Sequence, residues 1–146
     1  MKAENYAVRM AGVALLLALS ACGGGGGDAP PPAPPPPAGL QPTLASIQDN
    51  VFTPSCAKSG CHTGMGAQAG LNLDPGLSWQ NLHTVASSQD MSLTRVVPMD
   101  PDGSFLIHKL EGTTLVGARM PGDGPPYLQQ STIDMVRLWI QNGALP

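Results

Sequence analysis

A run of glycines followed by a run of prolines limits which part of this chain can fold. Residues 23–27 are all glycine, and residues 30–37 are proline except for Ala33. Glycine repeats form flexible coils and proline repeats form stiff, extended polyproline II segments, and neither can bury a core. The sequence therefore predicts a linker over residues 22–39 and one small domain over residues 40–146.

The segment before the linker has the features of a signal peptide. Lys2 and Arg9 give it a positive start, and its apolar run over residues 11–19 is too short to span a bilayer as a finished helix. The run ends in the residues LSAC at positions 19–22, which resemble the lipobox of bacterial lipoproteins. The alternative is an ordinary secretory signal whose cysteine is incidental.

The lipobox resemblance implies where the protein is located. It implies a signal peptide over residues 1–21 that is removed, and acyl chains on Cys22 that anchor the chain to a membrane surface without a spanning segment. Gly23, rather than aspartate, follows the cysteine. By the sorting rules of lipoproteins, this implies the outer membrane of a Gram-negative cell, with the domain on the periplasmic or the external face.

Composition limits both the core and the partners of the predicted domain. Aromatic residues make up only 4% of the chain, so a core built from protein alone would be thin, and a bound apolar cofactor would add bulk to it. The formal net charge is −3 for the whole chain and about −4 once residues 1–21 are removed. This balance argues against nucleic acid as a partner and leaves no basic patch for anionic lipid.

The strongest chemical signal is a pair of cysteines next to a histidine. Cys56 and Cys61 bracket four residues, and His62 follows directly. The stretch resembles the haem-attachment motif of c-type cytochromes, widened from C-x2-C-H to C-x4-C-H. In such a motif each thiol adds to a haem vinyl group, and the imidazole takes one axial position on the iron. Two other readings are a Cys56–Cys61 disulfide, which an oxidising envelope allows, and a zinc site, for which a fourth ligand is missing.

A second iron ligand is expected later in the chain. Met120 is followed by proline and lies 58 residues after His62, and this segment resembles the distal-ligand loop of single-haem cytochromes c. The alternatives are that Met120, one of seven methionines, is a core residue, or that His108 is the ligand and gives a bis-histidine haem of lower potential. His83 is a third and weaker candidate.

Four other residues have possible roles near such a cofactor. Arg95 and Arg119 could pair with haem propionates, because guanidinium groups suit carboxylates, although each could equally be a solvated surface residue. Trp79 and Trp139 are most simply core residues, and Trp79 could also contact the haem edge.

The hydrophobic periodicity predicts about four short helices, with residues 95–98 extended and no strand-rich pattern. The first runs from Thr43, its N-cap, to Phe52 and is ended by Pro54. The last begins at a capping box, Ser131 to Asp134, and stops at Asn142-Gly143. Two more helices are expected between them: one after the N-cap Asp74 that carries Leu77 to Val85, and one over residues 104–110.

These elements follow the order found in small bacterial c-type cytochrome domains, including those related to planctomycete-type cytochromes. The resemblance covers most of residues 40–146 and implies an all-α fold around one covalently attached haem c, with the last helix crossing the first. It implies a membrane-anchored one-electron carrier that is not an enzyme, has redox proteins as partners and has no small-molecule substrate.

Two functions of other classes are alternatives. One is a haem-free envelope lipoprotein module with a Cys56–Cys61 disulfide. The other is a haem peroxidase-like subunit, which would need an open distal position with acid–base residues beside it.

Overall fold

The computed structural model describes residues 34–114 and 116–146. The predicted signal peptide, Cys22 and most of the linker lie outside these residues and stay predictions. In the part of the chain that is described, no helix has the length and apolar character needed to cross a membrane.

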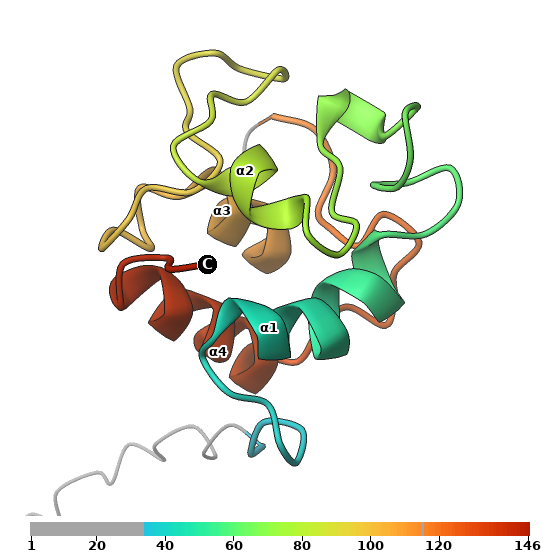
Figure 1. Ribbon diagram of the computed structural model, residues 1–146. Helices are drawn as coiled ribbons and strands as arrows, with labels where there is room; N and C mark the ends of the chain where they lie inside the picture. Colours follow the sequence, from blue (N-terminus) through green and yellow to red (C-terminus); the bar gives the residue numbers. More distant parts are fainter. Residues whose placement is uncertain (1–33, 115) are drawn as a thin grey trace, which may run out of the picture. The chain divides into compact units, whose positions relative to one another are not determined.

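The described residues form helices joined by long loops (Figure 1). They contain no strand, and the β-type pairing within residues 83–100 is limited to isolated bridges. The fold is therefore all-α, as the periodicity predicts. The helical elements are α1 (Leu44–Ile47), η1 (Gln48–Cys56), η2 (Gln68–Gly70), α2 (Ser78–Leu82), α3 (Phe105–Glu111) and α4 (Gln130–Gln141).

The first helix begins as predicted but ends later. Thr43 is the N-cap of α1, and its side chain accepts a hydrogen bond from the Ser46 amide at 3.3 Å. The helix then continues as the π-helix η1 through Cys56, with Pro54 inside it, so the prediction that Pro54 ends it is wrong. Proline breaks an α-helix because its ring meets the carbonyl four residues earlier, whereas the wider π-turn pairs residues five apart, as in the 2.7 Å bond from the Ala57 amide to the Phe52 carbonyl.

The second helix is shorter than predicted. Gly76 has a left-handed φ of +81°, and residues 74–77 form a turn in which the Leu77 amide donates to the Asp74 carbonyl at 2.9 Å. Helix α2 therefore begins at Ser78, and Asp74 is not its N-cap. It ends at Leu82, so Val85 lies outside it, and the extended His83 forms a bridge with Val96.

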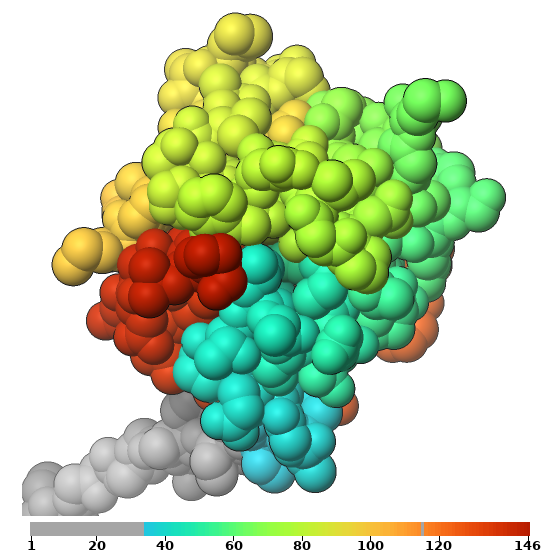
Figure 2. Space-filling model, in the orientation of Figure 1, coloured from blue at the N-terminus to red at the C-terminus, as the bar shows by residue number. Residues whose placement is uncertain are grey.

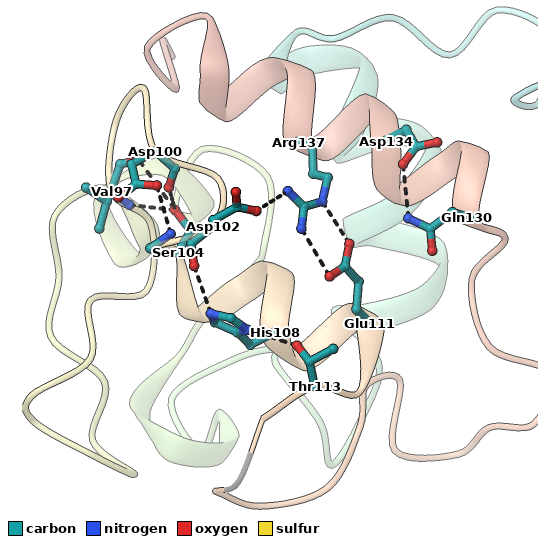
Figure 3. Close-up of polar contacts among 11 residues, drawn as sticks. Val97, Asp100, Asp102, Ser104, His108, Glu111, Thr113, Gln130, Asp134 and Arg137 are labelled. Carbon is teal, nitrogen blue, oxygen red and sulfur yellow. Dashed lines mark hydrogen bonds and ion pairs between the residues drawn. The ribbon is translucent and has the colours of Figure 1, made fainter.

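The last two helices lie where the sequence places them, except for one cap. Helix α3 is within one residue of the expected bounds. The predicted capping box of α4 is wrong: its N-cap is Gln129, Ser131 lies inside the helix, and Asp134 instead accepts a hydrogen bond from the Gln130 amide group at 3.0 Å (Figure 3). The predicted stop is correct, because the left-handed Gly143 lets its own amide donate to the Ile140 carbonyl at 2.9 Å, in a Schellman turn.

The core lies between the first and last helices and α3. Helix α4 packs against both α3 and α1, so the first and last helices are in contact, as the cytochrome resemblance implies. Figure 2 shows the C-terminal segment in red directly beside the α1 segment in cyan. Trp139 is buried, whereas Trp79 is half-buried and packs against the core. The fully buried side chains include Ile47, Val51, Phe52, Ile107, Leu110, Ile133, Val136 and Ile140.

Candidate cofactor site

Two adjoining cavities lie between η1, α3 and the loops that follow them. The first has a volume of about 140 Å³ and the second of about 340 Å³. The first is lined mainly by apolar side chains, among them Phe105 and Leu106 of α3. Four residues line both cavities, namely Cys56, His62, Gln68 and Met120. Three of these four are predicted haem-binding residues.

The environment of His62 leaves one ring nitrogen available. Its Nδ1 lies 3.1 Å from the Leu71 carbonyl oxygen. Because a carbonyl can only accept, Nδ1 must carry the proton in this hydrogen bond, and Nε2 of the neutral ring then has a free lone pair. Metal-binding histidines are oriented in this way, with the second nitrogen donating to a carbonyl or carboxylate. His62 is thus oriented as a ligand would be.

The two cysteines lie on either side of a turn that leads to His62. Cys56 ends η1, and the His62 amide donates to the Cys56 carbonyl at 3.1 Å, which closes the loop. Both cysteines are half-buried free thiols that line the second cavity. Burial raises the pKa of the Cys56 thiol to about 12, so this side chain is a neutral thiol at neutral pH and not a thiolate nucleophile.

Met120 lines the same cavities, although it lies far from the cysteines and His62 in the sequence. It lies in the loop between α3 and α4, and its amide donates to the Lys109 carbonyl at 2.8 Å. The side chain is half-buried, packs against the core and lines both cavities. The structure therefore brings Met120 together with Cys56, Cys61 and His62.

The rival histidines lie elsewhere. Both ring nitrogens of His108 are engaged, Nε2 at 2.8 Å from the Asp102 carbonyl oxygen and Nδ1 at 2.9 Å from the Thr113 hydroxyl (Figure 3). His83 stacks on Trp79 with ring centroids 4.6 Å apart. Neither histidine lines either cavity, so the geometry favours Met120 over His108 as partner of His62.

Two buried cations line the first cavity. Arg95 is only 8% exposed and donates to the carbonyls of Asn81 and Ala69, each at 2.8 Å. Ala69 has a left-handed φ of 55° and its carbonyl also accepts from Ser88 at 2.6 Å, so this strained residue helps to hold the guanidinium.

Lys109 is the second cation, at 7% exposure. Its Nζ donates to the Val116 carbonyl at 2.6 Å and lies 5.0 Å from the centre of the Phe105 ring. Burial lowers the pKa of both Lys109 and Arg95. Within the described residues neither cation has a carboxylate partner. Buried charge without a counter-charge is costly, so the first cavity suits a ligand that carries an anionic group.

Lys109 is a site residue that the sequence analysis missed. It follows Phe105 by four residues in a helix whose other inward positions are apolar, and a lysine inside an apolar stripe is the signal that could have revealed it. Arg119, which the sequence suggested, lines neither cavity. Its Nε donates to the Leu110 carbonyl at 2.9 Å, and its guanidinium lies 4.2 Å from the centre of the Tyr127 ring.

The zinc reading of the cysteine motif finds no support in the described residues. Among them, no three His, Cys, Asp or Glu side chains are grouped so that they could hold a metal ion. An iron held within a porphyrin does not need such a group, because the protein supplies only the axial ligands.

Comparisons with protein-family models, with characterised proteins and with solved structures found no match.

Proposed function

We propose that this chain is a single-haem c-type cytochrome that carries one electron at a time. The observation that carries the proposal is the convergence of four residues on two adjoining cavities: Cys56, Cys61, His62 and Met120. A bound haem c would supply a couple between ferric and ferrous iron.

The two cysteines would hold the cofactor covalently. Each S–H would add across a vinyl group of the haem, with sulfur bonded to one carbon and hydrogen to the other, and no atom would be lost. The four-residue spacer is compatible with this role because the hydrogen bond from the His62 amide to the Cys56 carbonyl closes the loop at 3.1 Å. Cys61 and His62 are adjacent in sequence, so attachment at Cys61 would bring the imidazole close to the iron.

His62 and Met120 would hold the iron of the haem, because both side chains line the two cavities. The Leu71 carbonyl fixes the His62 tautomer that leaves Nε2 free. The thioether of Met120 is a soft ligand that favours ferrous iron and raises the reduction potential relative to a second histidine.

Arg95 and Lys109 would compensate the two propionates. Both cations are buried beside the first cavity, and both are held by carbonyl oxygens instead of carboxylates. An anionic group on the ligand would provide the missing counter-charge, and charge-assisted hydrogen bonds to carboxylates are among the stronger polar contacts in proteins.

An electron carrier fits this lining better than an enzyme does. Met120 as an iron ligand would leave no position on the iron free for a substrate. The titratable side chains at the cavities are His62, the two cysteines, Asp123 and the two cations, and Asp123 is paired with Lys58. A peroxidase would need an acid–base residue beside an open iron. The lipid anchor at Cys22, the outer-membrane location and redox proteins as partners are parts of the same proposal.

Absorption spectroscopy tests the proposal after expression together with a cytochrome maturation system. The expected result is a reduced c-type α band together with a weak near-infrared band from sulfur–iron ligation. Protein without haem colour would favour the haem-free module with a Cys56–Cys61 disulfide. A high-spin spectrum that changes on adding peroxide would favour the peroxidase-like subunit.

A further inference from the structure

An ion pair joins the two segments that carry the proposed haem-binding residues. Lys58 lies between the two cysteines, and its Nζ is 2.9 Å from Oδ2 of Asp123. Asp123 follows Met120 by three residues and lines the second cavity. The pair therefore links the cysteine loop (residues 56–62) to the methionine loop (residues 119–124) beside that cavity.

The methionine loop is held to the rest of the domain from two sides. Its beginning is tied to α3, where the Met120 amide donates to the Lys109 carbonyl at 2.8 Å and Arg119 donates to the Leu110 carbonyl at 2.9 Å. Of the hydrogen bonds and ion pairs formed by the described residues, only the Lys58–Asp123 pair joins residues 120–124 to residues 56–62.

The widened cysteine spacing builds the turn that carries Lys58. The Cys61 amide donates to the Lys58 carbonyl at 2.9 Å, which makes residues 58–61 a β-turn. Gly60 is the third residue of this turn and has a φ of +76°, which glycine adopts without strain. With a spacer of two residues, the first position of such a turn would be the first cysteine itself, whereas the spacer of four residues places Lys58 there.

Charge supports the link between the loops. The hydrogen bond to Lys58 lowers the pKa of Asp123, and the same contact raises the pKa of Lys58. Both groups therefore stay ionised at neutral pH. The two side chains are 43% and 59% exposed, so water and salt weaken the attraction, and the pair should bias the position of the loop and not lock it.

We propose that the Lys58–Asp123 pair is a latch that keeps the Met120 loop closed over the second cavity, and that the two extra residues of the C-x4-C-H motif provide it. The latch deepens the proposed function and depends on it for the role of Met120 as an iron ligand. It makes Lys58 and Asp123 positioning residues, because neither needs to touch the cofactor.

The test measures how readily imidazole displaces Met120 in haem-loaded protein. Loss of the near-infrared sulfur–iron band is followed during imidazole titration of the wild type, Lys58→Gln, Asp123→Asn and the charge-swapped Lys58→Asp/Asp123→Lys double variant. Each single variant should bind imidazole about two- to fivefold more tightly, the range expected for an exposed ion pair at low salt. The double variant should return towards the wild type, and the differences should shrink at high salt.

A matched control and a second measurement keep the latch separate from the haem proposal. Asp134→Asn removes a half-buried carboxylate on α4 whose side-chain hydrogen-bond partner among the described residues is Gln130, and it should leave the imidazole affinity unchanged. Unchanged affinity in both single variants would overturn the latch.

If the wild type has no sulfur–iron band, the latch is tested by amide hydrogen exchange instead. That result would count against Met120 ligation and hence against the proposed function. The latch itself would then be judged on haem-free protein, where the amides of Met120 and Gly124 should exchange faster in Lys58→Gln and Asp123→Asn than in the wild type. Equal exchange rates would overturn the latch.

Discussion

Met120 is the residue on which the proposed reduction chemistry depends most. It lines both cavities with His62, and replacing it by alanine removes the thioether and keeps the backbone amide that donates to the Lys109 carbonyl. Met120→Ala should lose the near-infrared sulfur–iron band and turn the low-spin spectrum high-spin. Met99→Ala is the matched control, because Met99 is 76% exposed and its removal should leave the spectrum unchanged. A low-spin spectrum retained in Met120→Ala would show that another residue binds the iron.

Replacing Lys109 tests whether the first cavity binds an anionic group, and this test does not depend on the iron. Lys109→Met keeps most of the side-chain length and removes the buried charge. Its affinity for iron-free protoporphyrin IX should fall about tenfold, as expected for the loss of one charged hydrogen bond. Protein made without haem attachment can be titrated by porphyrin fluorescence.

Two comparisons make the Lys109 result specific. The dimethyl ester of the porphyrin lacks free carboxylates, so wild type and Lys109→Met should bind it about equally well. Arg119→Leu removes a cation that lines neither cavity, and it should bind both porphyrins as the wild type does. An equal loss of affinity for acid and ester in Lys109→Met would mean that the lysine acts through packing alone.

At the scale of the elements, the C-terminus of α4 depends on one glycine. Gly143 has a φ of +98°, and its turn allows the Ala144 amide to bond the Trp139 carbonyl at 3.0 Å. Gly143→Ala should lower the free energy of unfolding by about 1 kcal/mol, because a side chain is strained in left-handed conformations. Urea unfolding measures it. Gly66→Ala is the control, because Gly66 has an ordinary φ and nothing lies within 4 Å of an added Cβ. If Gly66→Ala lowered the free energy of unfolding as much as Gly143→Ala does, backbone strain at Gly143 would not be the cause.

The helices show which local signals survive packing. Thr43 and Asn142-Gly143 define the ends of their helices through hydrogen bonds to backbone groups only a few residues away, so the sequence predicts these helix ends correctly. The capping box failed because the Ser131 hydroxyl is buried inside α4. Pro54 failed as a stop because the sequence does not reveal that the helix widens to π-geometry.

The candidate site also combines residues that the sequence alone singles out with residues whose contacts depend on the fold. Cys56, Cys61 and His62 lie within one short stretch of the sequence, and the proline after Met120 singles out that methionine. The structure places all four residues at the second cavity. The pairing of Asp123 could not be predicted, because its partner Lys58 lies 65 residues away in the chain. The apolar stripe of its helix singles out Lys109, but its hydrogen bond to the Val116 carbonyl depends on how the loop after α3 folds. The π-helix that delivers Cys56 to the cavity is a further feature that only the fold reveals.

At the scale of the whole molecule, one ion-pair network connects helices and responds to pH. Arg137 of α4 donates to Glu111 of α3 at 2.7 Å and to Asp102 at 2.6 Å (Figure 3). The hydrogen bond from Arg137 lowers the pKa of Glu111 in the folded protein. Between this lowered pKa and the unfolded value of about 4.3, the unfolded chain binds more protons than the folded one.

The stability from Glu111 is therefore present above about pH 4.3 and is lost as the pH falls through the folded pKa. Glu111→Gln should unfold more easily than the wild type in urea at neutral pH, and its stability should fall less steeply between neutral and acidic pH. Equal slopes in the two proteins would show that the pair does not couple folding to protonation.

Intact mass under denaturing conditions is the most direct test of the central claim that Cys56 and Cys61 hold a haem. Addition of two thiols to two vinyl groups loses no atoms, so protein matured with a cytochrome maturation system should have the mass of the processed chain plus one whole haem. Cys56→Ser/Cys61→Ser should lack this increment. Wild-type protein with the mass of the chain alone, or lighter by the two hydrogens of a disulfide, would contradict the account.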